Sequence, residues 1–119
     1  MPNIMMPYDG KLADLASHER RVEVFKALAH SSRLYIVTRL AEGELGVSDL
    51  TREIGSDIST VSKHLAVLRN AGLIVDRREG QAVLYSLACP CVLEFLHCID
   101  AIAPFDETGA RRGSVCPTR

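Results

Sequence analysis

The chain has 119 residues, of which 47% are hydrophobic and 24% are charged, and its formal net charge is −1. The length suits one compact domain, and the apolar fraction supports a packed core, which excludes an intrinsically disordered chain. A net charge this close to zero excludes a uniformly basic surface, so binding to nucleic acid would require cationic residues gathered on one face.

The cationic residues are unevenly distributed along the chain. Lys63, Arg69, Arg77 and Arg78 lie within one stretch, residues 63–78, whose only acidic residue is Asp76. This stretch is therefore the candidate for contact with a polyanion.

The start of the sequence lacks the basic and apolar segments of a signal peptide, and no run of about 18 apolar residues follows. We therefore expect a cytoplasmic protein with no membrane partner. In that compartment the four cysteines are expected to be free thiols rather than structural disulfides. Their clustering after residue 88 favours metal binding or redox chemistry.

Apolar residues, prolines and glycines divide the chain into three segments. Apolar residues recur at helical spacing from about residue 11, so we expect residues 11–103 to form the folded domain. Residues 1–10 are expected to be irregular. Prolines and glycines indicate a flexible tail over residues 104–119.

The first half of the domain has the pattern of helices. Helical spacing predicts a first helix over residues 11–29 and a second helix that Ser31 or Ser32 caps. A third, short helix is expected over residues 47–54, with Ser48 as its cap.

A fourth helix is expected over residues 58–70, where Asp57 can cap the first turn. Its apolar stripe is formed by Val61, Leu65 and Leu68, which would hold the helix on the core. Gly72 is expected to end the helix in a left-handed conformation.

The end of the domain has the pattern of a hairpin followed by a helix. Residues 73–77 and 82–87 are rich in β-branched and apolar residues, and the Glu79–Gly80 pair between them predicts the turn. A last helix is expected from Cys89 or Pro90 to Ala103, since proline suits a first helical turn.

The order of helix, short helix, glycine turn, helix and hairpin predicts a winged helix-turn-helix. The expected fold is mainly α, with about five helices and one two-stranded hairpin as the wing. A Ser- and Thr-rich helix face alone is more often a solvated surface, and it is the order of the elements that favours double-stranded DNA as the partner. Small hydroxyl residues at a helix start allow close approach to the major groove, and the wing can reach phosphates. The candidate DNA-binding residues, which lie on this helix or near the hairpin tip, are Ser59, Thr60, Ser62, Lys63, His64, Arg69, Arg77, Arg78 and Gln81.

Five short motifs occur in order along the chain, at residues 25–34, 41–45, 59–65, 68–74 and 77–81. They resemble motifs of the ArsR/SmtB family. The resemblance covers about residues 18–103 and implies a winged-helix repressor that forms a homodimer through its first and last helices. It also implies that an inducer lowers the affinity for operator DNA. Ile58 departs from the family, because many members have a polar residue there.

Two inducer sites of this family are not reproduced here. The arsenite-type Cys-Val-Cys motif corresponds to residues 46–48, which read Gly-Val-Ser. The zinc type places a second ligand pair on the last helix near Ile102 and Phe105, whose side chains cannot hold a metal. The inducer site must therefore be argued from the cysteines of this chain.

Cys89 and Cys91 are the expected core of a sensor site, since thiolates favour soft ions such as arsenite, antimonite, cadmium or cuprous ion. Cys91 and Cys98 are separated by about 10 Å along a helix. Two sulfurs on one ion lie at most about 4.6 Å apart. A third ligand must then be Cys98 of the partner subunit, Cys116, or a residue of the same chain after the helix start unwinds. Cys98 can instead face its own copy across the dimer axis.

Three functions are consistent with the sequence. The favoured hypothesis is a repressor without a permanently bound cofactor, released from DNA when Cys89, Cys91 and Cys98 bind a thiophilic metal or metalloid, arsenite above all. The alternative is a repressor that senses thiol oxidation or reactive sulfur. A small thiol oxidoreductase is the remote alternative, disfavoured because Cys89-Pro90-Cys91 has one intervening residue and follows no thioredoxin-like pattern. Cysteines that merely fill the dimer interface are the structural alternative.

Overall fold

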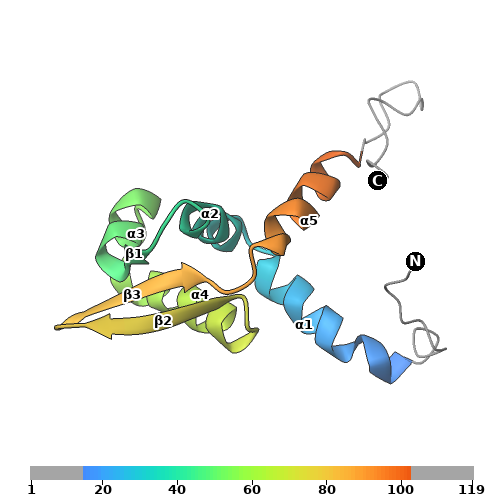
Figure 1. The fold of residues 1–119 in the computed structure, drawn as a ribbon, viewed down its shortest axis with the longest axis horizontal. Coiled ribbons are helices and arrows are strands. Elements are labelled where there is room, and N and C mark those ends of the chain that lie inside the picture. Colours follow the sequence, from blue (N-terminus) through green and yellow to red (C-terminus); the bar gives the residue numbers. More distant parts are fainter. Residues whose placement is uncertain (1–14, 103–119) are drawn as a thin grey trace.

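The computed structural model describes residues 15–102, which fold as one winged helix-turn-helix domain (Figure 1). The expected irregular start and flexible tail lie outside the described residues. Within the described part, no helix is long and apolar enough to cross a membrane. The elements are the 3-10 helix η2 (Leu15–His18), α1 (Glu19–Leu28), α2 (Ser31–Leu40), β1 (Leu45–Gly46), α3 (Val47–Ile54), α4 (Ile58–Asn70), β2 (Ile74–Glu79), β3 (Ala82–Leu87) and α5 (Cys91–Asp100).

The core forms around α4, whose apolar stripe packs against α2 and α3. Val61, Leu65 and Leu68 are fully buried, which confirms the predicted stripe. They share one cluster with Ile36 of α2 and Leu50 of α3. Each fully buried aliphatic side chain contributes about 1.5–3 kcal/mol, so this cluster fixes the orientation of α4.

Both predicted ends of α4 are confirmed. The Asp57 carboxylate accepts a hydrogen bond from the backbone N–H of Thr60 at 2.8 Å. Gly72 follows the helix with a φ of +85°, a left-handed conformation that favours glycine.

The predicted cap of α2 is wrong. Ser31 and Ser32 are both inside the helix, and His30 is the capping residue. Its Nδ1 accepts a hydrogen bond from the backbone N–H of Ser32 at 3.1 Å. A histidine ring can replace a hydroxyl here because it offers an acceptor nitrogen at the same place in the chain.

The predicted bounds of α3 are confirmed, but its predicted cap is wrong. Gly46 is the capping residue, and Ser48 lies inside the first turn. The Asp49 carboxylate accepts a hydrogen bond from the backbone N–H of Gly46 at 3.3 Å, which satisfies that donor at the entrance of the helix.

The wing is a three-stranded antiparallel sheet in the order β1-β3-β2. The hairpin of β2 and β3 was predicted, but β2 extends to Glu79, so Gly80 and Gln81 form the turn. The two-residue strand β1 was not predicted, because a strand this short has no periodicity. Its Leu45 and Gly46 pair with Tyr85 and Leu84, which satisfies backbone groups on the outer edge of β3.

The first and last helices project from the domain and diverge (Figure 1). Both are shorter than predicted: α1 begins at Glu19 after η2, and α5 runs from Cys91 to Asp100 with Pro90 as its cap. Phe25 of α1 contacts Phe95 of α5 edge to face, with ring centroids 5.6 Å apart. Around this contact the two helices leave an exposed apolar surface, to which Val22, Phe25, Phe95, Ile99 and Ile102 belong.

Candidate DNA-binding surface and cysteine site

The start of α4 presents a polar, exposed face. Ser59, Thr60, Ser62 and Lys63 are all exposed, as a recognition helix requires. The Ser59 hydroxyl donates to the Asp57 carboxylate at 3.0 Å, so it also takes part in the cap. Hydrogen bonds from Thr60 and Ser59 lower the pKa of Asp57. Among the ion pairs of residues 15–102 none involves Lys63, whose ammonium group is available for a phosphate.

His64 lies in the core and not on that face, which corrects its place among the candidate DNA contacts. Its side chain is 8% exposed, and Arg33 Nε donates to its Nδ1 at 3.1 Å. The His30 ring packs against it with a centroid distance of 4.4 Å. Burial lowers the pKa of His64, with further contributions from the nearby His30 and Arg33. The spacing of 61, 64, 65 and 68 on one helix face was the sequence signal for this position.

The cations near the wing differ in their surroundings. Arg77 donates to both oxygens of Glu44, at 2.6 and 2.9 Å, and is also paired with Glu79. Arg69 lies 3.5 Å from the Asp76 carboxylate. Arg78 is exposed at the end of β2 and forms no ion pair with any carboxylate of the described residues. The exposed Gln81 lies at the turn beyond it.

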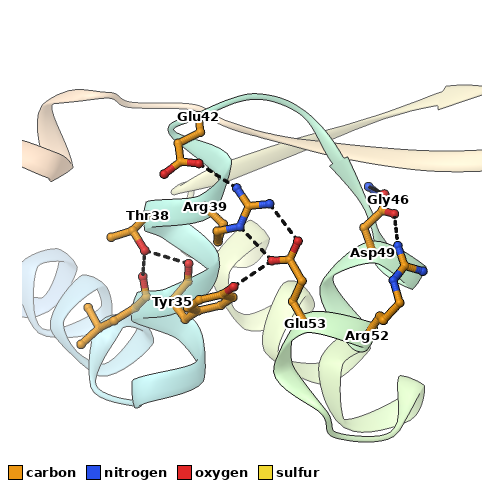
Figure 2. Close-up of polar contacts among 9 residues, drawn as sticks. Tyr35, Thr38, Arg39, Glu42, Gly46, Asp49, Arg52 and Glu53 are labelled. Carbon is orange, nitrogen blue, oxygen red and sulfur yellow. Dashed lines mark hydrogen bonds and ion pairs between the residues drawn. The ribbon is translucent and has the colours of Figure 1, made fainter.

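A polar network holds α3 against α2 (Figure 2). Arg39 donates from Nε and Nη2 to the two oxygens of Glu53, each at 2.8 Å, and the Tyr35 hydroxyl donates to the same carboxylate at 2.8 Å. These bonds lower the pKa of Glu53 to about 2. Glu42 binds the remaining side of the Arg39 guanidinium at 3.0 Å. The network fixes the first helix of the helix-turn-helix, and sequence reasoning missed it because Glu53 lies 14 positions from Arg39 and on another helix.

The predicted thiol pair comes together at the start of α5. Cys89 Sγ and Cys91 Sγ are 2.7 Å apart, and both residues are exposed. The contact with Cys89 raises the pKa of Cys91, since it stabilises the protonated thiol. Two thiols this close suit one soft ion as shared ligands after a small side-chain rotation.

The third predicted ligand, Cys98, is a half-buried thiol further along α5. No group of three or more His, Cys, Asp or Glu side chains that could hold a metal exists within residues 15–102. One chain therefore does not bring Cys98 to the thiol pair. Cys116 lies outside the described residues.

A cavity of about 540 Å³ lies beside the thiol pair, between α1, the end of α4 and the start of α5. Its wall contains both sulfur-bearing residues and is otherwise largely apolar. The apolar part of the wall is formed by Val24, Phe25, Leu73, Val92 and Phe95.

Arg20 connects this cavity to the recognition helix. It lines the cavity, and its Nη2 donates to the carbonyl oxygen of Ala71, the C-terminal capping residue of α4. A Cβ atom at Gly72 would lie 2.9 Å from Nη2, so the glycine also makes room for this bond. Sequence reasoning identified Gly72 as a helix end but missed its arginine partner.

Comparison with known proteins decides the family. Residues 30–75 match the profile described as "Bacterial regulatory protein, arsR family". The transcriptional activator HlyU of Vibrio cholerae is 36% identical over 100 residues, which cover 77% of this chain and 93% of HlyU. The chain belongs to the arsR family. Its fold, DNA-binding element and family identify a transcriptional regulator and exclude the thiol oxidoreductase.

Solved structures of bacterial regulators have the same fold. HlyU from Vibrio cholerae superimposes with a TM-score of 0.64 at 35% identity, covering 72% of this chain and 96% of HlyU. The homodimeric winged helix-turn-helix domain of Mb0332 from Mycobacterium bovis gives 0.65 at 31% identity, covering 81% and 87% of the two chains. The arsenical resistance operon repressor of Escherichia coli is 44% identical over 68 residues, which cover 56% of this chain and 58% of the repressor.

Proposed function

We propose that this protein is a repressor that binds operator DNA as a homodimer and leaves it when Cys89 and Cys91 bind a thiophilic metal or metalloid. The observation that carries the proposal is the 2.7 Å separation of the two sulfurs beside the helices expected to form the dimer. Arsenite is the favoured inducer, in line with the similarity to the arsenical resistance repressor of Escherichia coli.

DNA binding is assigned to the exposed start of α4 and to the wing. Ser59, Thr60 and Ser62 permit close approach of the helix to the major groove, while Lys63 and Arg78 bind phosphates. Arg77 and Arg69 reach phosphates only by exchanging their carboxylate partners, so we assign them a smaller share. Exposed ion pairs of this kind are weak and exchange at little cost.

The homodimer is assigned to the apolar surface of α1 and α5. Residues such as Phe25 and Ile99 are exposed in the single chain, and a second copy would bury them. A dimer also places two copies of α4 in successive major grooves, about 34 Å apart. The homodimeric state of Mb0332 supports this assignment.

The inducer is assigned to Cys89 and Cys91 as the primary ligands. Because residues 15–102 of one chain bring only two thiols to this place, we assign the third thiolate to Cys98 of the partner subunit. A ligand bound to Cys89 and Cys91 would lie beside the cavity that Arg20 also lines, and Arg20 binds the end of α4. Ligand binding can thereby change the position of the recognition helix, and an allosteric effect requires such a difference between the two states.

The second candidate is a thiol-oxidation sensor on the same surface. The sulfur contact favours it, since the two thiols are already closer than van der Waals contact. Oxidation would join Cys89 and Cys91 by an S–S bond, and two electrons and two protons would pass to an oxidant such as a peroxide.

One experiment separates these outcomes. Reduced protein is titrated onto a DNA fragment from upstream of its own gene in three samples: without addition, with arsenite, and with hydrogen peroxide. The mass of the protein in each sample is measured by intact mass spectrometry. Release by arsenite with a metalloid adduct supports the first candidate, whereas release by peroxide with a loss of two hydrogens supports the second. Unchanged DNA binding in every sample, or unchanged release in a Cys89→Ser, Cys91→Ser double variant, contradicts both. Cys98→Ser tests the third ligand: a weaker response to arsenite with an unchanged response to peroxide is expected if Cys98 of the partner subunit completes the site.

A further inference from the structure

Ile58 is an exposed apolar residue at the start of the recognition helix. It is the first residue of α4, and its side chain is 54% exposed. The residues Ser59, Thr60 and Ser62, which follow it in the first turns, are exposed and polar. Ile58 lies at the opposite end of α4 from Ala71, where Arg20 of α1 contacts the helix. The proposed dimer surface of α1 and α5 therefore does not account for this isoleucine.

The fold gives Ile58 no packing role. Among residues 15–102 it belongs neither to the core cluster nor to the partly buried apolar residues that pack on that cluster. Helix stability does not explain it either, because β-branched residues are weaker helix formers than alanine and Asp57 already caps the first turn. Single exposed apolar residues are common on protein surfaces, and the distinguishing feature of Ile58 is its place on α4.

That place puts Ile58 where a recognition helix contacts bases. In a helix-turn-helix the N-terminal residues of the second helix contact the base edges in the major groove. Side chains of a helix lean toward its N-terminus, so the first residue extends furthest in that direction. The neighbouring Ser59 hydroxyl already donates to the Asp57 carboxylate. The apolar side chain beside it has no such bond to give up when DNA binds.

We propose that Ile58 recognises thymine, by contact with the C5-methyl group in the major groove, once in each half-site of the operator. The methyl group of thymine is the apolar feature on base edges that otherwise present hydrogen-bond donors and acceptors. An isoleucine side chain cannot pair with those polar groups, and burying them against it without a partner is unfavourable. The inference rests on the proposed DNA-binding surface and names a residue that sets its base preference.

The test compares thymine with uracil, which lacks only this methyl group. The reduced full chain is titrated by fluorescence anisotropy onto two synthetic duplexes of the fragment from upstream of its gene. One duplex carries thymine throughout, and the other carries uracil in place of thymine within the region that the protein protects from nuclease. Burial of one methyl group corresponds to about three- to fourfold in affinity, and a homodimer makes the contact twice. We therefore expect about tenfold weaker binding to the uracil duplex, and equal affinity overturns the inference.

Ile58→Ala isolates the contribution of this side chain. The position is exposed and alanine is a good helix former, so the urea midpoint should stay close to that of the unmodified protein. We expect the variant to bind the thymine duplex more weakly and to bind the two duplexes with nearly equal affinity. A preference for thymine as large as that of the unmodified protein would mean that another residue contacts the methyl groups, and the inference would be wrong.

Val75→Ala is the matched control. Val75 is also β-branched and 49% exposed, but it lies in β2, which follows the C-terminal end of α4. The control should keep the full preference for thymine. An equal loss of preference in Val75→Ala and Ile58→Ala would remove the assignment to Ile58.

Duplexes with one uracil at a time locate the contact. Because a dimer presents two copies of Ile58, the sensitive thymines should occupy two positions related by the dyad of the operator. Sensitive positions without this symmetry overturn the inference. If the unmodified protein binds neither the thymine nor the uracil duplex, the proposed function itself is wrong. If it binds both with equal affinity, DNA binding stands and only the recognition of thymine by Ile58 is wrong.

Discussion

Arg20 of α1 donates a hydrogen bond to the carbonyl oxygen of Ala71, with 2.5 Å between Nη2 and the oxygen, at the C-terminal end of α4. The last carbonyls of a helix lack intrahelical partners, and a cation there also complements the helix dipole. Because Arg20 lines the cavity beside Cys89 and Cys91, this bond links the proposed sensor site to the DNA-facing helix.

Replacing Arg20 should weaken the communication between the two sites. In Arg20→Met the side chain keeps its apolar stem but cannot bind the Ala71 carbonyl. Since such a bond is worth about 0.5–1.5 kcal/mol, we expect operator affinity without ligand to fall about two- to tenfold. We also expect a smaller further loss when the thiols bind arsenite, as measured by fluorescence anisotropy.

The control is Arg21→Met. Arg21 lines the same cavity, but among the described residues it donates to the Ser17 carbonyl and to no atom of α4. It should respond to arsenite like the unmodified protein. If Arg20→Met also retained the full response, coupling through Ala71 would be ruled out.

The available cations at the DNA-facing surface should control the salt dependence of binding. Lys63→Ala and Arg78→Ala are each expected to weaken binding to all sequences alike. Each should reduce the slope of log affinity against log salt concentration by about one for every copy of the residue that contacts a phosphate. Lys26→Ala, on α1, is the matched control and should leave the slope unchanged. If only Lys26→Ala reduced the slope, the DNA-binding face would be wrongly assigned.

Buried His64 should make the fold sensitive to mild acid. Its pKa is lowered in the folded state, so between that value and about 6.5, the usual value for an unfolded chain, the unfolded state binds more protons. The free energy of unfolding is therefore highest above pH 7 and falls as the pH is lowered through 6.5. His64→Gln should reduce this loss, measured as the difference in urea midpoint between pH 7.5 and 5.5.

His97→Gln, at an exposed position of α5, serves as the comparison for His64. It should keep the pH response of the unmodified protein. An equal response in all three proteins would mean that the pH effect does not arise at His64.

Glu53 should stabilise the packing of α3 in a second pH range. Its pKa of about 2 is lower than the usual value of about 4.3, because Arg39 and Tyr35 donate to the carboxylate. The contribution of ionised Glu53 to the free energy of unfolding is fully present above pH 5 and is lost as the pH falls toward 2. Glu53→Gln should lower the urea midpoint at pH 7, and the difference from the unmodified protein should shrink below pH 4.

Glu42→Gln provides the control for Glu53, because Glu42 is more exposed and contacts Arg39 through one bond. Its effect on the midpoint should be smaller at every pH. A larger effect of Glu42→Gln would mean that the Arg39–Glu53 pair does not hold the two helices together.

Elements with strong local signals were predictable from sequence. The bounds of α4 follow from the acceptor side chain of Asp57, the spacing of Val61, Leu65 and Leu68, and the glycine that ends the segment. These signals act within a few residues of one another, so they require no knowledge of the remaining fold. The hairpin follows for the same reason, since alternation and a glycine turn define it locally.

Features that depend on distant residues were not predictable. The partners Arg20 and Ala71 are 51 positions apart. The hydrogen bond from Arg33 to His64 joins two helices across 31 positions of the chain. For Cys98 the sequence gives the separation from Cys91 along α5 but not the position of a second subunit, so its role as a ligand is still a prediction.

The Cys89-Pro90-Cys91 arrangement has a consequence for how inducer binding must be measured. The two sulfurs are neighbours because of three consecutive residues, so a denatured chain retains much of the same chelating unit. A ligand that also binds the unfolded chain raises the melting temperature by less than its affinity would suggest. Thermal-shift screens will therefore under-report thiophilic compounds for this regulator, and direct titration is the sound method for ranking them.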